Sequence, residues 1–195
     1  MNIVIFGPPG AGKGTQADNL VNEFNFFKVS TGDLLRKEIK EKTSLGIQIK
    51  SIIDKGNLVS DDIIESLIRT LISNKSYKNR LIFDGYPRNL NQAKNLDLLM
   101  KNHNQNISLV FSLKVDRPVI IKRILGRQIC VKCGLTFNKF FNPASHESHK
   151  CEEKFLKSRS DDNETAIKNR FETYTKETLP ILDYYEKQNL LTNID

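Results

Sequence analysis

The sequence predicts an α/β fold built on a mainly parallel sheet. Short apolar runs alternate with segments of helical periodicity along the chain, and this alternation implies right-handed crossovers between parallel strands. A glycine-dense loop at residues 7–15 follows the first apolar run and precedes the first helical segment. With 195 residues and 38% hydrophobic content, the chain is long enough for one sizeable core that carries small inserts.

The predicted strands are short apolar runs, a pattern typical of buried parallel strands. They cover residues 3–6, 27–29, 81–83, 109–113 and 190–194. The third of these runs ends in Asp84. A carboxylate at the C-terminal tip of a strand lies at the edge where α/β sheets bind ligands.

Helices are predicted between these strands from the spacing of apolar residues and from their caps. The first follows the loop, with apolar residues at 17, 20, 21 and 24. The others run through residues 34–39, 44–55 and 63–71, onward from Asn89 or Asn91, and through 118–124. Capping residues precede the second and fourth helices, at 30–33 and 60–62, while Gly56 and Gly126 end the third and the last.

Two stretches interrupt the alternation of strands and helices. Residues 30–59 form a helical excursion between strands, and residues 126–162 are polar, rich in turn residues and contain every cysteine. We therefore expect one core domain made of residues 1–29, 60–125 and 163–195, with inserts at 30–59 and 126–162.

The net charge of +7 fits either nucleic acid or a polyphosphate ligand. The arginines favour the second interpretation, because a guanidinium grips phosphate with two parallel hydrogen bonds. Most lysines are scattered along the chain, whereas several arginines stand beside glycines, acidic pairs or motif residues: Arg36, Arg88, Arg123, Arg127, Arg159 and Arg170.

No sequence feature predicts a nucleic-acid or membrane partner. The chain lacks a basic run with interleaved aromatic residues, the pattern expected of a single-strand binder. The apolar run before Gly7 is too short for a signal peptide, and no stretch reaches the length of a membrane span. We therefore expect a cytoplasmic protein.

The loop from Gly7 to Thr15 is typical of a phosphate-binding loop. Its glycines let backbone N–H groups converge on an anion, the helix that follows adds its dipole, and Lys13 supplies a cation for the β- and γ-phosphates. The general pattern places Ser or Thr directly after the lysine, whereas Gly14 intervenes here before Thr15.

The ordered set of motifs resembles the long-lid adenylate kinases among the nucleoside monophosphate kinases. The motifs occupy residues 7–16, 30–36, 56–59, 84–92, 123–127 and 161–170, so the similarity runs nearly end to end. The resemblance implies a P-loop NTPase-type parallel five-stranded sheet flanked by helices, with an AMP-binding insert at 30–59 and a lid at 126–162. In this family the inserted Gly14 is the usual form of the loop.

The resemblance further implies Mg²⁺-dependent interconversion of ATP plus AMP and two ADP by a monomer. The implied ATP-binding residues are Gly10, Ala11, Gly12, Lys13, Gly14, Thr15, Arg123, Arg127, Thr136 and Phe137. The implied AMP-binding residues are Thr31, Arg36, Asn57, Leu58, Val59, Gly85, Tyr86, Pro87, Arg88, Gln92, Arg159 and Arg170. The implied catalytic residues are Lys13, Arg88, Arg123, Arg127, Arg159 and Arg170, and Asp84, with help from Asp33, would order the hydrated magnesium.

Structural interpretations of some of these residues stay open on the sequence alone. Thr31 is equally typical of a helix cap, a glutamine such as Gln92 on a helix is usually solvated, and Asp84 can simply pair with an arginine. Phe137, Phe140 and Phe141 are interpreted as lid or core packing.

The cysteines of the second insert suggest a metal site that is one ligand short. Cys130 and Cys133 have the spacing of a zinc knuckle, and Cys151 lies in the same insert. Some family members complete this pattern with Cys or Asp three residues later, where this chain has Lys154, which cannot bind zinc. The fourth position is open to His146, His149, Glu152 or Glu153. The alternative is a metal-free lid that keeps its cysteines as small apolar residues.

Rival functions remain at this stage. The nearest is a kinase that accepts UMP, CMP or GMP, or that uses GTP as the donor. A nucleotide switch or ATP-binding regulatory module needs the loop and a magnesium carboxylate, but it does not need Arg36 and Arg88. A basic zinc-ribbon protein that binds nucleic acid leaves the sequence Asp-Gly-Tyr-Pro-Arg at 84–88 unexplained.

Overall fold

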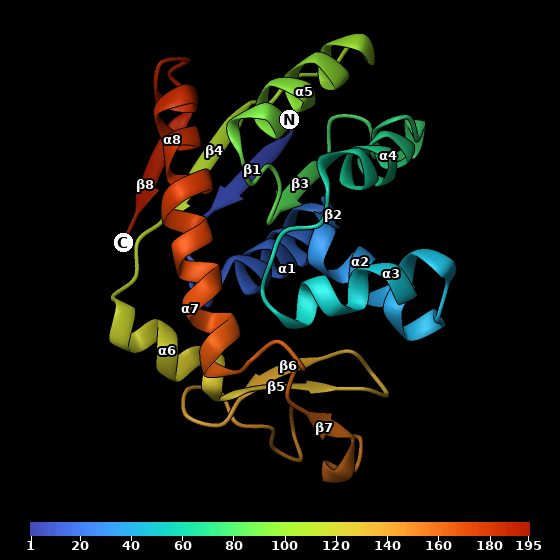
Figure 1. The fold of residues 1–195 in the computed structure, drawn as a ribbon, viewed down its shortest axis with the longest axis vertical. Coiled ribbons are helices and arrows are strands. Elements are labelled where there is room, and N and C mark those ends of the chain that lie inside the picture. The colour runs from blue at the N-terminus through green and yellow to red at the C-terminus, as the bar shows by residue number, and fades with distance from the viewer.

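A computed structural model describes all 195 residues. Its centre is a five-stranded sheet in the order β2-β3-β1-β4-β8 (Figure 1). Every neighbouring pair of strands in this sheet is parallel. The strands are β1 (Ile3–Phe6), β2 (Phe27–Ser30), β3 (Leu81–Asp84), β4 (Leu109–Leu113) and β8 (Leu191–Ile194). The predicted α/β class with a parallel five-stranded sheet is therefore confirmed.

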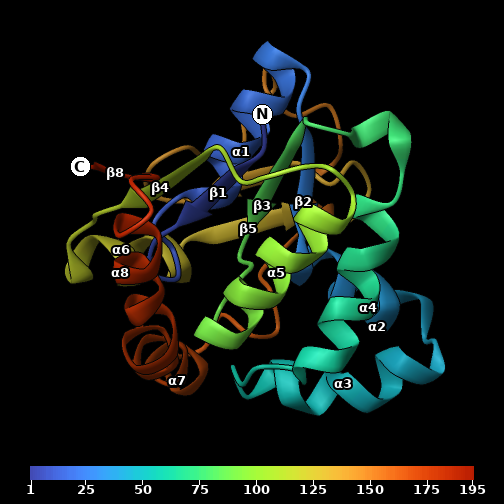
Figure 2. The same cartoon turned by 90° about the horizontal axis from the view of Figure 1, so that it is seen from above.

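Helices cover both faces of this sheet (Figure 2). They are α1 (Lys13–Phe24), α2 (Thr31–Glu41), α3 (Ser44–Asp54), α4 (Asp61–Ile72), α5 (Leu90–Asn102), α6 (Arg117–Leu125), α7 (Glu164–Thr173) and α8 (Leu179–Glu186). Short 3₁₀ turns occupy Lys75–Tyr77 and Glu153–Phe155, and a π-helical turn at Tyr174–Thr178 joins α7 to α8. None of these helices has the length and apolar composition needed to cross a bilayer.

Alternate residues of the central strand enter different parts of the core. Val4 and Phe6 belong to the large cluster formed with α4, α5 and α8, whereas Ile3 and Ile5 pack with Ala17 of α1. All four strand residues are buried, as expected for a parallel strand covered on both faces. Because β1 is packed on both faces, its direction is fixed, and so is the position of the loop that follows it.

Local sequence signals define the ends of most elements. Ser30, Thr43, Asn89 and Asn163 each cap a helix through a side-chain oxygen that accepts a backbone N–H. Asn89, and not Asn91, opens α5. Thr31 is the first residue of α2 and Ser30 is its cap, so the capping role considered for Thr31 is wrong.

The two expected inserts have different architectures. Residues 30–59 hold α2 and α3, and residues 126–162 hold a three-stranded antiparallel sheet in the order β6-β5-β7. Its strands are β5 (Arg127–Cys130), β6 (Thr136–Asn138) and β7 (Leu156–Lys157). The sequence pattern indicated only a polar, turn-rich segment here, because strands of two to four residues are too short to show an alternation.

Candidate functional site

The loop between β1 and α1 is shaped to surround an anion. Gly10 and Gly12 have φ angles of +82° and +101°, which residues with a Cβ rarely adopt. A Cβ on Gly10 would stand 2.7 Å from Cγ1 of Ile124. Helix α1 starts at Lys13 with no side-chain cap and no acidic residue in its first turn. Its first N–H groups and the positive end of its dipole are therefore left for a ligand.

Lys13 reaches back over this loop. Its Nζ donates to the carbonyl oxygens of Gly7 and Pro8, at 2.7 and 3.0 Å. Burial, together with the charges of Arg88, Arg127 and Arg170, lowers the pKa of Lys13 to about 8 against the opposing effect of Asp84. An anion beside this ammonium would favour its charged form.

Arginines from distant parts of the chain converge near Lys13. The pKa of Arg170 is lowered by burial and then by the charges of Arg127, Arg88, Arg36 and Arg159. The pKa of Arg159 is likewise lowered by burial and by Arg36 and Arg127, and its Nε is buried without a hydrogen-bond partner. Guanidinium groups keep their charge under such conditions, so the cluster is a strong attractor for polyanions.

Two buried aspartates hold part of this cluster in place. Asp162 accepts from Nε of Arg127 at 2.8 Å and also pairs with the Nη2 group of the same arginine. Asp161 pairs with Arg170. Both carboxylates are almost fully buried. We did not assign either aspartate to the site from the sequence, although their position between Arg159 and Arg170 is a signal for such a role.

A cleft lies between the first insert and the carboxyl edge of the sheet. It is lined by most of the residues predicted to bind AMP, namely Thr31, Arg36, Asn57, Leu58, Val59, Gly85, Tyr86, Arg88, Gln92 and Arg170. Pro87 and Arg159 are not among its lining residues. Its apolar walls are Leu35, Ile53 and Ile64. These residues were not predicted, because their helical spacing indicates only a position in the core.

Two polar residues of the cleft are already engaged with the protein. The Thr31 hydroxyl donates to the Gly85 carbonyl at 3.0 Å. Gln92 is buried, not solvated; its Oε1 accepts from the Arg88 N–H at 2.7 Å and its Nε2 donates to Asp61 at 2.6 Å. Gln92 therefore orders the turn that carries Arg88, which leaves one amide N–H for a ligand.

The two arginines of the cleft differ in their surroundings. Arg36 is held by Asp33, whose Oδ1 lies 2.6 Å from Nη2, and Lys28 also approaches Asp33, at 3.8 Å. Arg88 is more deeply enclosed: its Nε donates to the Gly85 carbonyl at 2.7 Å, and burial lowers its pKa. Because Asp33 is already bound by two cations, Asp84 is the better placed carboxylate for a divalent metal.

Asp84 ends β3 beside the phosphate-binding loop. A Cβ on Gly14 would stand 3.3 Å from Oδ2 of Asp84, so a glycine at this position leaves room between loop and carboxylate. Oxygen ligands such as this are the ones that Mg²⁺ prefers. The residues present therefore fit a hydrated magnesium carried by a nucleotide.

The lid places two exposed aromatic rings near the loop. Nη1 of Arg123 donates to the Ala11 carbonyl at 3.2 Å, and its guanidinium lies 5.7 Å from the ring of Phe141. Phe140 and Phe141 are half exposed, and both rings also lie against the Lys122 ammonium, at 5.4 and 5.6 Å, so they pack on one face only. Phe137, in contrast, is buried: only 5% of its surface is exposed, and its ring packs against His149. Thr136, the residue before it, is exposed.

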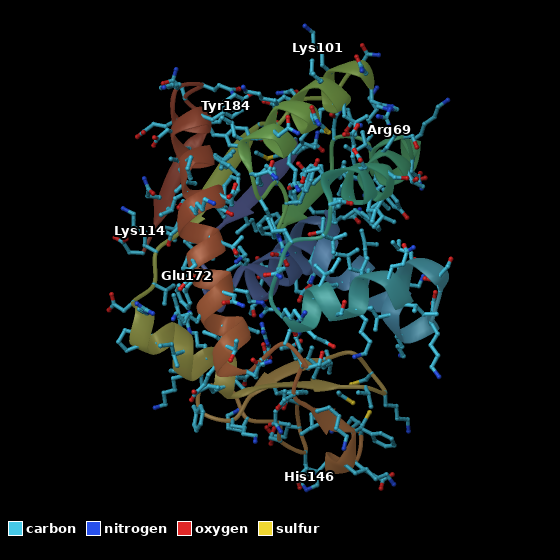
Figure 3. The ribbon with its side chains drawn as sticks, in the orientation of Figure 1. Arg69, Lys101, Lys114, His146, Glu172 and Tyr184 are labelled. Carbon is cyan, nitrogen blue, oxygen red and sulfur yellow. The ribbon has the colours of Figure 1, made fainter.

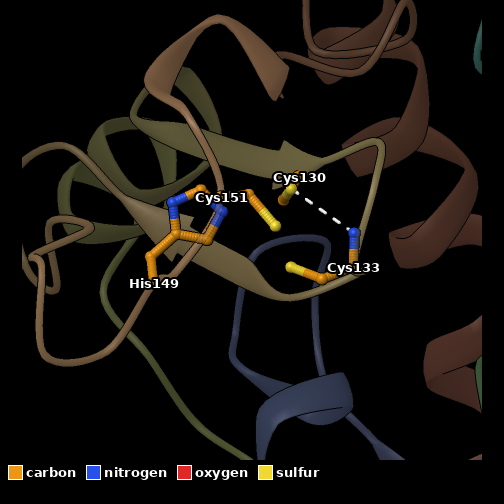
Figure 4. Close-up of side chains that lie close together, drawn as sticks. All are labelled: Cys130, Cys133, His149 and Cys151. Atoms are coloured by element: carbon orange, nitrogen blue, oxygen red, sulfur yellow. Dashed lines mark hydrogen bonds between the residues drawn. The ribbon is translucent and has the colours of Figure 1, made fainter.

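The cysteines of the lid gather around one histidine (Figure 4). The ligand atoms of Cys130, Cys133, His149 and Cys151 all lie within 4.8 Å of one another. Burial alone would raise the pKa of Cys130, but the Cys133 N–H, the His149 imidazole and the Lys132 N–H outweigh it and lower this pKa to about 6. The Cys133 N–H lies 3.4 Å from Sγ of Cys130. This donor set fits a soft cation such as Zn²⁺.

The fold and this site define a class of enzyme. A parallel α/β core with a phosphate-binding loop, a second anion-binding cleft and a shared arginine cluster is the arrangement of a P-loop kinase that works on two phosphorylated ligands.

The comparisons with known proteins identify the family. The family model for adenylate kinase matches residues 5–190. The adenylate kinase of Pelagibacter ubique (strain HTCC1062) is 48% identical over 195 residues, which cover all of this chain and 92% of that protein. Those of Clostridioides difficile (strain 630) and Methanocella arvoryzae are 41% and 43% identical, again over the whole of this chain and over 90% and 91% of theirs. The chain therefore belongs to the adenylate kinase family, and it is a nucleoside monophosphate kinase.

Proposed function

We propose that this chain catalyses the reversible, Mg²⁺-dependent transfer of the γ-phosphoryl group of ATP to AMP, which gives two molecules of ADP. The observation that carries the proposal is that the phosphate-binding loop and the separate cleft share one set of cations: Arg88 and Arg170 line the cleft and also act on Lys13 of the loop. A phosphoryl group that passes between two anions needs such neutralisation.

The donor ATP binds at the loop. The N–H groups of residues 12–15, at the start of α1, surround its β- and γ-phosphates, and Lys13 exchanges its bonds with the Gly7 and Pro8 carbonyls for the phosphate oxygens. Arg123 and the exposed rings of the lid provide an apolar and cationic surface beside the loop. Such a surface suits a nucleobase, which stacks on aromatic rings and on guanidinium planes.

The acceptor AMP binds in the cleft. Arg36 and Arg88 hold its phosphate, while Leu35, Ile53 and Ile64 enclose its base. The remaining Nε2 proton of Gln92 supplies a donor to an edge of that base. A small number of polar groups on apolar walls is the composition of a selective nucleotide pocket.

The transferred group lies between the two ligands, among Arg127, Arg159 and Arg170. The unpartnered Nε of Arg159 is a buried donor that a phosphoryl oxygen satisfies. No general base is needed, because the attacking phosphate oxygen of AMP is already anionic. The residues thus act through position and charge, and the lid excludes water that would otherwise accept the phosphoryl group.

Two metals accompany this proposal. Asp84 holds the hydrated Mg²⁺ that enters with ATP, and this ion supplies further neutralisation of the phosphates when bound. The Cys/His cluster of the lid holds a structural Zn²⁺. Membership of the family also supports a cytoplasmic monomer as the working form.

A monophosphate panel tests the proposal. Initial rates of ADP formation are measured in a coupled assay with ATP·Mg and AMP, UMP, CMP or GMP. We expect AMP to be preferred by a large factor. Preference for UMP or CMP would overturn the acceptor assignment, and absence of transfer to every monophosphate would favour an ATP-binding regulatory module.

A further inference from the structure

The metal-binding cluster of the lid combines ligands from two segments that are distant in sequence. Cys130 and Cys133 lie at the end of β5 and in the turn after it, and His149 and Cys151 lie in the long loop before β7 (Figure 4). Tetrahedral Zn²⁺ with bonds of about 2.0–2.3 Å holds its ligand atoms about 3.5–3.8 Å apart. The observed limit of 4.8 Å is about 1 Å longer, which small side-chain rotations accommodate.

His149 has the properties of a ligand side chain. Only 6% of its surface is exposed, and its Nε2 is buried without any hydrogen-bond partner. A buried nitrogen in this state costs free energy unless another group binds it. The imidazole ring also packs edge-on against Phe137 of β6, with 5.0 Å between ring centroids. The ring is therefore fixed in place beside the three thiols.

The other residues that the sequence left open are directed elsewhere. His146 is exposed, and Figure 3 places it at the outer end of the lid. Glu152 is bound by Lys154 at 2.7 Å, and Glu153 is exposed. None of these three belongs to the group whose ligand atoms converge.

We propose that His149 is the fourth ligand, so that the lid holds Zn²⁺ in a Cys₃His site. The second pair of ligands then has the spacing His-x-Cys. The fourth donor thus precedes Cys151 by two residues, and Lys154 is not needed. This inference rests on the zinc assignment in the proposed function, but it is independent of which nucleotides the enzyme uses. The half-exposed or exposed state of Cys151 and Cys133 also disfavours a role for them as packing residues.

A metal bound by these four ligands would stabilise the part of the lid that leads to Arg159, a member of the arginine cluster. After Cys151 the chain makes the 3₁₀ turn Glu153–Phe155 and enters β7, where Leu156 and Lys157 pair with Cys130 and Ile129 of β5, and it then reaches Arg159. A metal that joins the two segments fixes this short pairing. Loss of the metal would loosen β7 and with it the placement of Arg159.

Metal content and Co²⁺ spectroscopy test the fourth ligand. The full chain is purified without chelators, and zinc is measured per chain by mass spectrometry. The zinc is then replaced by Co²⁺, whose visible bands and thiolate charge-transfer bands report ligand number and type. The variants are His149→Ala, His149→Cys and, as a matched control, His146→Ala.

We expect one zinc per chain in the wild type and in His146→Ala. Zinc affinity should fall by on the order of 100-fold or more in His149→Ala, since replacing even the residues behind a ligand costs about 10–100-fold. His149→Cys should bind Co²⁺ with a stronger thiolate charge-transfer band. This result would show that residue 149 is a metal ligand even if the alanine variant folds poorly.

Unchanged zinc affinity and an unchanged Co²⁺ spectrum in His149→Ala would overturn the assignment of the fourth ligand. Failure of the wild type to bind zinc or Co²⁺ would overturn the metal site altogether. Activity with ATP and AMP, measured on the same preparations, separates either result from a failure of the proposed kinase function.

Discussion

The ammonium group of Lys13 lies where its charge is disfavoured until an anion arrives. It is bound only by two loop carbonyls, and burial with three nearby arginines lowers its pKa from 10.5 to about 8. Phosphate oxygens beside it would raise this pKa again. Nucleotide binding is therefore linked to proton uptake by Lys13.

The first prediction concerns this linkage. Below pH 8 Lys13 is protonated with or without nucleotide, so this group should not make the affinity for ATP change with pH. Above about pH 8 the free protein loses a proton that the complex keeps, so ATP affinity should fall by up to about tenfold per pH unit. Calorimetry in buffers of different ionisation enthalpy measures the uptake. Lys13→Arg, which stays charged, should show none; equal uptake in that variant would contradict the assignment to Lys13.

The second prediction is that Arg88→Ala lowers turnover by about 100- to 1000-fold, the typical cost of removing one preorganised donor. The fold should survive, because the backbone bonds of residue 88 to Gln92 and Thr178 remain. The melting temperature should not fall, since a buried cation that repels Arg36 is removed. Arg69→Ala is the control, because Arg69 pairs only with Glu65 on the surface of α4. Near-normal turnover of Arg88→Ala would remove Arg88 from the site.

The sequence predicted residues with distinctive chemistry better than residues that only shape the site. Lys13 and Arg88 stand in motifs whose residue types leave few alternatives. Leu35 in the cleft wall looks like any core leucine, and exposed Phe141 carries no local signal that separates it from buried Phe137. Such differences depend on how the lid folds over α6, which no short window of sequence contains.

At the scale of elements, the end of the first insert is held by a tight contact between Gly56 and α7. Gly56 lies two residues after the end of α3, with φ at +76°, and a Cβ there would stand 2.7 Å from the carbonyl oxygen of Ala166 in α7. Nearby, Asn169 of α7 donates to the Lys55 carbonyl at 3.0 Å, and Ser160 donates to Asp54 at 2.7 Å. The end of the first insert is thus packed against the chain that returns from the second insert.

The third prediction uses a pair of glycines that share a backbone conformation. Gly134 has φ at +80° but no atom within 4 Å of its Cβ position. Gly134→Ala should lose about 1 kcal/mol of unfolding free energy from backbone strain alone, whereas Gly56→Ala should lose about 2–4 kcal/mol because strain and a backbone clash combine. Urea denaturation measures both. Equal losses would show that the contact with Ala166 relaxes at no cost.

For the whole molecule, the parallel sheet and the helices as far as α6 were predictable because strand and helix differ in period and carry separate caps. No helix was predicted between residues 163 and 189, where α7 and α8 lie. The lid sheet was not, because β5, β6 and β7 are very short and pair across a long loop. The pairing of Asp161 and Asp162 with arginines was missed for a related reason: the partners come from β5 and α7. Contacts of this kind depend on topology.

The central claim is that both nucleotides meet at one arginine cluster, so that the phosphoryl group passes directly from one to the other. The most direct test follows γ-labelled ATP with Mg²⁺, in the presence and absence of AMP. We predict that the label appears in the β-phosphate of ADP formed from AMP, and that without AMP little label is released as inorganic phosphate. Release of labelled inorganic phosphate at the same rate with and without AMP, with none in ADP, would contradict the account.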